Sequence, residues 1–318
     1  MHRKITIPEA ADFLRTADNF LILTHRRPDG DTIGCAAALC GGLRAMGKRA
    51  FVLENPQFTS KFRPFLDGLT TGTPDENAIL VAVDIAARTL FPLGYEDYAD
   101  RTALALDHHG RNDLYAEQSY VDPSAAACGE IILELLRELG VTPNQRIAEA
   151  LYCAISTDTG CFRYSNTTAA TLRAAACCKD CGADTFAINQ AMFLTKRLAR
   201  LKLEAYLTES TEFYAGGLVA ISLLPSQTRA ALGITEDDID DISGFGREIA
   251  GVGIGVMIRD EQGEGKLSVR TSPEYDASAI CAALGGGGHR AAAGATVPGG
   301  IAAAKAAVLR VLTDMGVL

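Results

Sequence analysis

No apolar run in this chain approaches the roughly eighteen residues that a membrane-crossing helix needs, so a role in a membrane would require a partner. The N-terminal stretch MHRKITIPEA has no apolar core of the kind that a secretory signal carries. The nine cysteines are an odd number scattered through the chain, unlike the framework of a disulfide-rich secreted domain. We therefore expect a soluble protein of the reducing cytoplasm.

Basic residues are too few for a protein that coats long nucleic acid. The 30 Lys and Arg are outnumbered by 39 Asp and Glu, which leaves a net charge of −9. Binding along a nucleic acid draws on many contacts from Lys and Arg to phosphate. We therefore do not expect long duplex DNA as a partner, whereas a short substrate with few phosphates fits the composition.

The first half of the chain alternates between short apolar runs and helical patterns. With 318 residues, 48% of them hydrophobic, the chain is long enough for two domains. The pattern predicts strands at FLILT (20–24), AFVL (50–53), AILVAVDI (78–85) and TALALD (102–107), and helices over 32–47, 127–140, 144–156 and 168–182. Such alternation favours an α/β domain, a parallel sheet covered by helices on both faces.

The second half has a different pattern. Strands are predicted over 218–224, 251–259 and 266–272, and helices over 276–284 and 301–312, which indicates a smaller α+β domain. Between the halves, residues 186–210 have helical periodicity throughout, so we interpret them as one connecting helix. The predicted organisation is an α/β domain over 1–184, a helical linker over 185–209 and an α+β domain over 210–318.

Polar side chains gather where the predicted strands of the first half end. The carboxyl ends of parallel strands share one edge of a sheet, and ligands bind in the crevice there. Three polar clusters follow predicted strands: one after FLILT, one at the end of ILVAVD and one at the end of TALALD. A fourth cluster, STDTG, follows the predicted helix over 144–156, and its Thr and Gly leave the carboxylate free to face the crevice. The candidates are His25, Asp29, Asp31, Asp84, Asp107, His108, His109 and Asp158.

Several carboxylates at one edge would repel each other unless cations neutralised them, because a nearby negative charge raises the pKa of a carboxyl group. A divalent metal removes that cost. Oxygen ligands with a minority of imidazoles, and no thiolate, suit Mn²⁺ or Mg²⁺ better than structural zinc. We expect manganese, with magnesium as the second choice.

Five motifs carry a family resemblance. HRRPDGDTIG (25–34), AVD ending at Asp84, DHH (107–109), TDTG (157–160) and GGGGH (285–289) occur in the order that is typical of the DHH phosphoesterase superfamily. The stretch GGGGHRAAAG resembles the DHHA1 substrate-binding domain. The resemblance covers both halves of the chain and implies a catalytic DHH domain followed by a substrate-binding DHHA1 domain.

The resemblance also implies roles for single residues. His25 and Asp29 would bind one metal ion, and Asp31, His108 and Asp158 the other. Asp84 takes the position of the family's metal-bridging aspartate, Asp107 would orient an imidazole, and His109 would face the scissile phosphate. His109 would then either protonate the leaving oxygen or hold the phosphate, and the sequence does not separate these roles.

Substrate contacts are predicted in both halves. Four glycines in a row, Gly285 to Gly288, allow backbone amides to approach a phosphate or base closely, although they could also form a flexible loop. His289 and Arg270 resemble the family's substrate-clamping residues. Asn112 resembles a family substrate contact but is also ordinary turn chemistry, and Arg163 could hold phosphate or pair with an acid. The predicted contacts are His109, Asn112, Arg163, Arg270, Gly286, Gly287, Gly288 and His289.

Two further clusters have simpler explanations. CCKDC (177–181) contains a C-x-x-C pair, but no second pair or nearby histidine completes a zinc site, so we interpret it as buried helical thiols. The acidic run EDDIDD (236–241) is typical of a solvated surface or a helix start, and we predict no metal there.

The preferred function is a manganese-dependent phosphoesterase that hydrolyses short oligonucleotides to mononucleotides, and also 3′-phosphoadenosine 5′-phosphate (PAP) to AMP. The alternative is a phosphodiesterase for linear products of cyclic dinucleotides such as pApA. An inorganic pyrophosphatase is disfavoured by GGGGH, and a non-catalytic nucleotide-binding module by the filled ligand positions. The apolar helical faces suggest a homodimer.

Overall fold

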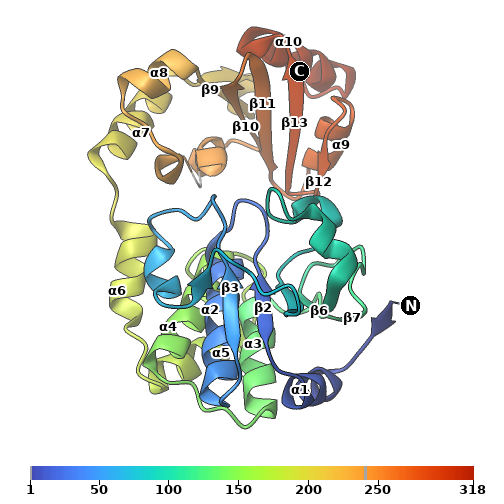
Figure 1. Cartoon of the computed structure of the whole chain (residues 1–318). Coiled ribbons are helices and arrows are strands. Elements are labelled where there is room, and N and C mark those ends of the chain that lie inside the picture. The colour runs from blue at the N-terminus through green and yellow to red at the C-terminus, as the bar shows by residue number, and fades with distance from the viewer. Residues whose placement is uncertain (1, 240–241) are drawn as a thin grey trace. The chain divides into compact units, whose positions relative to one another are not determined.

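The structure is a computed structural model that describes residues 2–239 and 242–318. The chain divides between Thr195 and Lys196 into two compact units, each of which contains its own sheet (Figure 1). The predicted combination of an α/β and an α+β domain is confirmed. Within the described residues, no helix is both long and apolar enough to cross a membrane.

The sheet of the first unit has seven strands in the order β1-β7-β6-β5-β2-β3-β4, and every neighbouring pair is parallel. From β2 the chain continues to β3 and β4 on one side, and then crosses to β5 on the other side of β2. This change of direction is a topological switch point, where open parallel sheets bind their ligands. The strands are β1 (Arg3–Lys4), β2 (Phe20–Leu23), β3 (Ala50–Leu53), β4 (Thr70–Thr71), β5 (Ile79–Val83), β6 (Thr102–Asp107) and β7 (Gln118–Val121).

The two faces of this sheet are covered differently. On one face, Phe20 and Ile22 of β2 pack into a core that includes helices α1 to α5 and Ile188 of the segment after them. The other face of β2 is buried as well, which explains why β2 is apolar at every position. On the other face, Leu21 and Leu23 pack against connecting segments that contain 3₁₀ turns at Arg88–Leu90 and Glu96–Arg101. The helices are α1 (Ile7–Thr16), α2 (Gly30–Ala45), α3 (Cys128–Glu138), α4 (Gln145–Asp158) and α5 (Ala169–Asp180).

The expectation that helices cover both faces of the sheet is therefore wrong. Among the described residues, the second face is covered by connecting segments and 3₁₀ turns and by no α-helix. Pro92 and Gly94 interrupt the segment between β5 and β6, and such residues disfavour a regular helix. Strands β1, β4 and β7 were also not predicted, since each is short and none is fully buried.

Helix α2 lies at the centre of the first core and packs closely against α4. A Cβ atom added at Gly34 would lie 2.3 Å from the backbone oxygen of Ala150 on α4, so only glycine fits at this contact. The close approach fixes the N-terminus of α2, which carries Asp29 and Asp31, beside the C-terminus of α4, which carries Asp158.

The predicted single helix over 186–210 is wrong. Helix α6 (Thr185–Asn189) continues as a π-helical turn over Gln190–Leu194, and the backbone is extended at Thr195 before α7 (Leu198–Ser210) begins. Apolar residues of the first part pack in the core of the first unit, and those of α7 pack in the second unit. Because each part faces a different core, a continuous apolar period did not mean a continuous helix. The boundaries 1–184, 185–209 and 210–318 stay a proposal.

The second unit contains a mixed six-stranded sheet in the order β12-β13-β11-β10-β9-β8, in which only β9 and β10 are parallel. The predicted strands and helices are present. Strands β12 and β13 were missed because their glycine and alanine residues give a weak strand signal. Strand β8, which has only three residues, was missed as well. The elements are β8 (Glu212–Tyr214), β9 (Val219–Leu224), β10 (Ile254–Glu261), β11 (Glu264–Thr271), β12 (Gly287–Gly288), β13 (Ala292–Pro298), α8 (Ser226–Ala231), α9 (Ala277–Ala282) and α10 (Gly300–Asp314).

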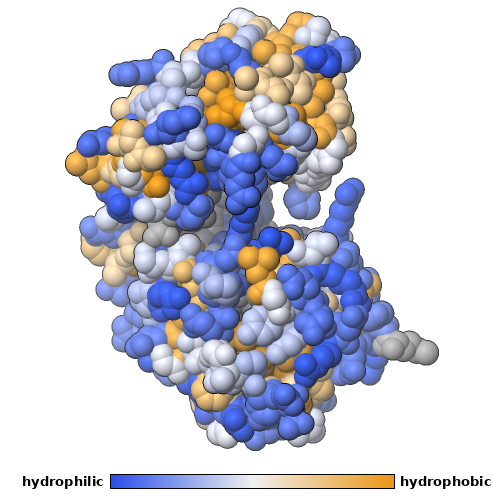
Figure 2. Space-filling model, turned by 45° about the horizontal axis from the view of Figure 1, so that its top comes forward, coloured by the Kyte–Doolittle hydropathy of each residue, from blue (hydrophilic) through white to orange (hydrophobic). Residues whose placement is uncertain are grey.

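The face drawn in Figure 2 is hydrophilic over most of its area, with hydrophobic residues in smaller patches. Among the large apolar side chains that are exposed, Phe186 and Leu194 lie in the first unit and Leu198 at the start of α7. Isolated apolar side chains are ordinary on a protein surface, so this distribution alone assigns no interface.

Candidate metal centre

The predicted polar clusters meet at the carboxyl ends of three neighbouring strands, β6, β5 and β2. His25 follows β2 by two residues, Asp84 follows β5 directly, and Asp107 is the last residue of β6. His108 and His109 come next in the chain. The expectation that these side chains share one edge of the sheet is confirmed, and that edge is the switch point between β2 and β5.

Two carboxylates reach the site from the first turn of α2. Asp29 is the N-cap, and its Oδ1 accepts the backbone N–H groups of Asp31 (3.0 Å) and Thr32 (3.2 Å). Asp31 is almost fully buried, and its two oxygens accept the N–H groups of Cys128 (2.7 Å) and Gly129 (3.0 Å). Backbone N–H groups thus hold both carboxylates in place.

The six predicted metal ligands form two adjacent groups that meet at Asp84. In the first group, His25 Nε2 lies 3.4 Å from Asp29 Oδ1 and 3.7 Å from Asp84 Oδ2. In the second, His108 Nε2 lies 3.5 Å from Asp84 Oδ1, 3.6 Å from Asp158 Oδ2 and 3.8 Å from Asp31 Oδ2. The structure therefore brings His25, Asp29, Asp31, Asp84, His108 and Asp158 together, and the two oxygens of Asp84 face different groups.

Both imidazoles are oriented as metal ligands are. The Nδ1–H of His25 donates to the carbonyl oxygen of Arg26 (2.9 Å), and the Nδ1–H of His108 donates to that of Ala125 (3.2 Å). A carbonyl can only accept, so Nδ1 carries the proton and Nε2 offers its lone pair to the site. A second hydrogen bond of this kind is usual for metal-bound histidine.

Asp84 has the features of a carboxylate that lacks its natural partner. It is 3% exposed, and its Oδ1 is buried with no hydrogen-bond partner among the described residues. Its φ of 59° lies in the left-handed region, which is costly for a residue other than glycine. A cation at Oδ1 would supply the missing interaction.

Electrostatics favours cations beside Asp31, Asp84 and Asp158. Burial raises the pKa of Asp31 and of Asp84 well above the usual range, and neighbouring carboxylates raise both further. Burial also raises the pKa of Asp158, which lies at the C-terminus of α4, where the helix dipole disfavours negative charge. The donor set of carboxylate oxygens and imidazole nitrogens fits divalent ions such as Mn²⁺ or Mg²⁺.

Asp107 orients His109. Its Oδ1 accepts the Nδ1–H of His109 (2.8 Å), and its Oδ2 accepts the amide of Asn112 (2.6 Å). The hydrogen bond to Asp107 raises the pKa of the His109 imidazole above its ordinary value. The side-chain oxygen of Asn112, Oδ1, accepts the N–H of Leu114 (2.7 Å). Both polar groups of the Asn112 side chain therefore have partners nearby, and a contact between Asn112 and the substrate stays a prediction.

Arg163 lies on an unusual turn after Asp158. Gly160, Cys161 and Phe162 all have φ between 54° and 63°, three consecutive left-handed residues, which L-amino acids rarely adopt. The exposed Arg163 closes the turn by donating from Nε to the carbonyl oxygen of Gly160 (2.6 Å). It pairs with no acid in the described part of the chain, and its contact with phosphate stays a prediction.

The other predicted contacts belong to the second unit. Arg270, on β11, donates to Ser243 Oγ (2.9 Å). Gly287 and Gly288 form β12, which pairs with β13, and the N–H of His289 donates to the carbonyl oxygen of Ala292 (2.8 Å) at the turn between these strands. The glycine run is thus part of a hairpin rather than a flexible loop, and its contact with substrate remains a prediction.

Two clusters were predicted to lack metal. Asp240 and Asp241 of the acidic run lie outside the described residues, while Asp238 accepts from Arg197 (2.6 Å). In the cysteine cluster, Cys178 is buried against the core of the first unit, and Cys177 and Cys181 are half-buried free thiols.

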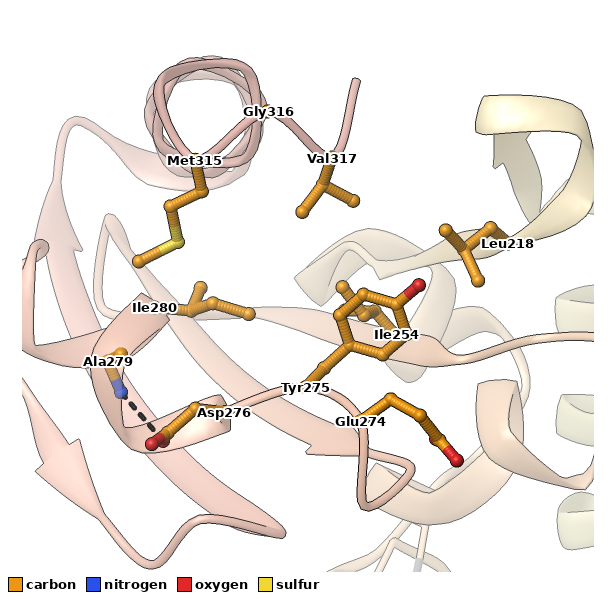
Figure 3. Close-up of a pocket in the computed structure, with 10 residues that line it drawn as sticks. All are labelled: Leu218, Ile254, Glu274, Tyr275, Asp276, Ala279, Ile280, Met315, Gly316 and Val317. Carbon is orange, nitrogen blue, oxygen red and sulfur yellow. Dashed lines mark hydrogen bonds between the residues drawn. The ribbon is translucent and has the colours of Figure 1, made fainter.

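A pocket of about 360 Å³ in the second unit contains none of the predicted residues. Figure 3 shows its apolar wall, formed by Ile254 of β10, Ile280 of α9 and Met315 after α10. Glu274 and Asp276 lie at its edge, and the Asp276 carboxylate caps α9 by accepting the N–H of Ala279 (3.0 Å). None of the residues that line this pocket belongs to the metal centre.

Sequence reasoning missed one group behind the metal centre. The thiol of Cys35 donates to Asp31 Oδ1 (3.2 Å), so this carboxylate has three donors. This contact could have been predicted, because Cys35 follows Asp31 by four residues and residues four apart lie on the same face of a helix. The contribution of the Cys128 and Gly129 amides could not be seen, since they are far away in the sequence.

Comparisons with known proteins agree with this architecture. The model of the DHH family, N-terminal domain, matches residues 19–155, and that of the DHHA1 domain matches residues 219–314. A bifunctional oligoribonuclease and PAP phosphatase NrnA of Thermus thermophilus is 34% identical over 288 residues, which cover 87% of this chain and 84% of the relative. The protein of the same name from Bacillus subtilis is 26% identical over 290 residues, covering 88% of this chain and 90% of the relative.

Among solved structures, an exopolyphosphatase-related protein of Bacteroides fragilis has the same fold, with a TM-score of 0.88 at 20% identity over 97% of this chain and 95% of that one. The family resemblance expected from the five motifs is confirmed by the two matching domains and the relatives. The chain belongs to the DHH/DHHA1 family of phosphoesterases.

Proposed function

We propose that this phosphoesterase uses two divalent ions, Mn²⁺ first and Mg²⁺ second, to hydrolyse short oligonucleotides to nucleoside monophosphates and PAP to AMP. The observation that carries the proposal is the position of Asp84, whose Oδ2 faces His25 and whose Oδ1 faces His108. His25 and Asp29 would hold one ion, and Asp31, His108 and Asp158 the other. Asp84 would offer one oxygen to each.

When bound, the two ions supply a nucleophilic hydroxide at neutral pH and stabilise the charge that develops on the phosphoryl group. The protein's own part is to fix the ligands before the substrate arrives. Asp29 and Asp31 accept backbone N–H groups, and both metal-binding imidazoles donate from Nδ1 to carbonyl oxygens, so the site needs little reorganisation.

His109 is proposed as the group that protonates the leaving oxygen. Its Nδ1–H donates to Asp107, which leaves Nε2 for the substrate. The raised pKa of the imidazole favours the protonated form, which a general acid requires. Asn112 keeps Asp107 in place through its amide, and this position is also compatible with a contact to the substrate.

Recognition of the rest of the substrate is assigned to Arg163 in the first unit and to Arg270, Gly286, Gly287, Gly288 and His289 in the second. The named activities of the relatives from Thermus thermophilus and Bacillus subtilis support short oligonucleotides and PAP as substrates. The net charge of −9 supports short substrates rather than long duplex DNA. We propose that the enzyme acts in the cytoplasm as a homodimer.

The test is a parallel assay with Mn²⁺ against diadenylate, PAP, linear pApA and pyrophosphate. We expect turnover of diadenylate and PAP with release of AMP. Turnover restricted to pApA would favour the alternative phosphodiesterase, and turnover of pyrophosphate alone would contradict the proposal. Asp84→Ala should abolish activity with the fold retained, whereas Asp67→Ala, which removes an exposed carboxylate outside the centre, should not.

A further inference from the structure

Two asparagine side chains donate hydrogen bonds to the backbone of proposed metal ligands. Asn55 Nδ2 lies 3.2 Å from the carbonyl oxygen of His25, and Asn166 Nδ2 lies 3.2 Å from that of Asp158. His25 belongs to the first group of ligands and Asp158 to the second. Each group therefore has an asparagine, outside the ligand set itself, that holds part of it in place.

Asn55 lies between the loop after β3 and the turn that carries His25. The residue is 0% exposed. Its Nδ2 also lies 3.4 Å from Thr24 Oγ1, and its Oδ1 accepts the N–H of Gln57 (3.0 Å). Burial of an amide is costly unless its polar groups are paired. Here the pairs connect the loop to His25 and to the residue before it, so the buried amide fixes the position of a metal ligand.

The other peptide group of His25 is held by α2. The N–H of His25 donates to Thr32 Oγ1 (3.3 Å). The hydroxyl of Thr32, which is fully buried, donates in turn to the carbonyl oxygen of Val83 (3.0 Å), the residue directly before Asp84. The backbone of His25 is thus held on both sides, by the loop after β3 and through α2 by β5.

Asn166 joins the two segments that supply the second group of ligands. Its Nδ2 donates to the carbonyl oxygens of Ala126 (3.1 Å) and Asp158 (3.2 Å). Ala126 follows Ala125, whose carbonyl oxygen accepts the Nδ1–H of His108. Asp158 is the last residue of α4, where carbonyl oxygens lack a partner within the helix. One side chain therefore connects the segment that orients His108 to the helix end that carries Asp158.

The position of these ligands matters because a metal centre tolerates little displacement. Its ligands must be held within about 0.5 Å of the productive geometry by groups that are themselves fixed. His25 lies in a turn and Asp158 at a helix end, and such segments move more than the middle of a strand or helix. Hydrogen bonds to these two backbones are therefore expected to determine how tightly the ions bind.

We propose that Asn55 and Asn166 are positioning residues of the metal centre, each for one of its two ions. Asn55 places His25 for the ion that this histidine shares with Asp29. Asn166 places Asp158 and His108 for the other ion. The inference rests on the two ions of the proposed function, and it means that the affinity of each ion can be changed separately without the removal of a ligand.

The experiment measures the affinity of metal-free protein for Mn²⁺ by isothermal titration calorimetry, in the absence of substrate. Two backgrounds separate the ions, because His108→Ala retains the ligands of the first ion and His25→Ala those of the second. Asn55→Ala and Asn166→Ala are introduced into each background. Urea denaturation of every protein reports whether the fold is retained.

Asn55→Ala should weaken Mn²⁺ binding about tenfold in the His108→Ala background and by less than about twofold in the His25→Ala background, as expected for a group that orients one ligand. Asn166→Ala should give the opposite pattern. Equal weakening in both backgrounds would indicate a general loss of structure and would overturn the inference. Unchanged binding in both backgrounds, or a background that binds no ion, would overturn it as well.

The control is Asn144→Ala, which removes the N-cap of α4. Asn144 Oδ1 accepts the N–H of Ile147 (3.0 Å), and the cap lies about 20 Å along the helix from Asp158. The loss of a cap should lower the unfolding midpoint. Mn²⁺ affinity should stay unchanged in both backgrounds, which shows that lost stability alone does not weaken an ion.

A second variant applies if Asn55→Ala does not fold. Thr32→Val retains the shape of the side chain but removes the acceptor of the His25 N–H. In the His108→Ala background it should also weaken Mn²⁺ binding about tenfold. Unchanged affinity in this variant would mean that the hydrogen bonds to the His25 backbone do not set the affinity of the first ion, and the inference would fail.

Assays of the wild type and the two single variants separate this inference from the proposed function. If the asparagine variants give the expected binding pattern but the wild type hydrolyses neither diadenylate nor PAP, the inference stands and the proposed function fails. If the wild type hydrolyses both compounds but Asn55→Ala and Asn166→Ala bind Mn²⁺ as the wild type does, the inference fails and the proposed function stands.

Discussion

Asp31, on α2, caps the first turn of α3 through the backbone N–H of Cys128, which lies 2.7 Å from its Oδ2. The second oxygen accepts the N–H of Gly129 (3.0 Å), and the residue at the N-cap position, Ala127, provides no side-chain acceptor. A proposed metal ligand is thus also the cap of a helix that begins far away in the sequence. Asp84, in contrast, has a buried oxygen with no partner among the described residues.

This difference predicts opposite effects of two similar substitutions in metal-free protein. In Asp31→Asn, one of the two backbone N–H groups would face an amide –NH₂ in a buried site, so we expect a loss of about 1–3 kcal/mol in the free energy of unfolding. In Asp84→Asn, an unpartnered charge disappears, and we expect a gain of similar size. Urea denaturation in EDTA measures both. Destabilisation by Asp84→Asn would contradict the assignment.

The gain from Asp84→Asn should depend on pH. The pKa of Asp84 is raised in the folded protein by burial and by nearby carboxylates, so the folded state holds its proton more tightly than the unfolded state. The stability of the wild type therefore falls as pH rises from about 4, the unfolded value, through the folded pKa. The variant lacks this loss, so its advantage should be small at pH 4 and largest at alkaline pH. A pH-independent difference would point to packing instead.

Asp107→Asn should change the pH dependence of catalysis through His109. If protonated His109 is the acid, activity is present below its pKa and is lost as pH rises through it. Removal of the carboxylate takes away the main cause of the raised pKa, so the alkaline limb of kcat/KM should move to lower pH. We also expect kcat to fall about 10- to 100-fold, as is usual when an orienting residue is lost. A uniform fall in kcat/KM with an unmoved alkaline limb would indicate a purely structural role.

The sequence predicted that the candidate metal ligands lie together, because each of them lies next to a recognisable strand or helix end. His25, Asp84 and His108 follow buried apolar strands, and a parallel sheet necessarily aligns such ends. What could not be predicted depends on contacts between distant segments. The hydrogen bond from Cys128 to Asp31 and the left-handed backbone at Asp84 are examples, because neither leaves a pattern in the local sequence.

The same limit explains the errors in the fold. The apolar residues over 186–210 do recur at helical spacing, but they pack into two different cores. Ile188 lies in one core and Leu203 in the other. Periodicity reports that a residue is buried, not which core buries it. Strand β13 was missed for a related reason, since its alanines are placed in the sheet by their partners on β11 rather than by intrinsic strand propensity.

Metal stoichiometry should separate the two proposed ligand groups. His25→Ala and His108→Ala each remove one imidazole, and each should leave about one ion bound at Mn²⁺ concentrations that saturate the wild type with two. Asp84→Ala should weaken both ions, because its oxygens face both groups. Isothermal titration and metal analysis after gel filtration measure the ratio. Loss of both ions in His25→Ala would show that the two groups are not independent.

The glycine run allows a structural role to be separated from a role in binding. A Cβ atom at Gly286 would lie 2.1 Å from the carbonyl oxygen of Gly294 on β13, whereas one at Gly287 would meet no atom within 4 Å. Gly286→Ala should therefore destabilise the hairpin, visible as a lower unfolding midpoint. Gly287→Ala should keep the wild-type midpoint, and if the amide of Gly287 approaches the substrate, the added methyl group should raise KM for dinucleotides about tenfold. An unchanged KM in a stable Gly287→Ala protein would mean that Gly287 does not contact the substrate and contributes to the hairpin alone.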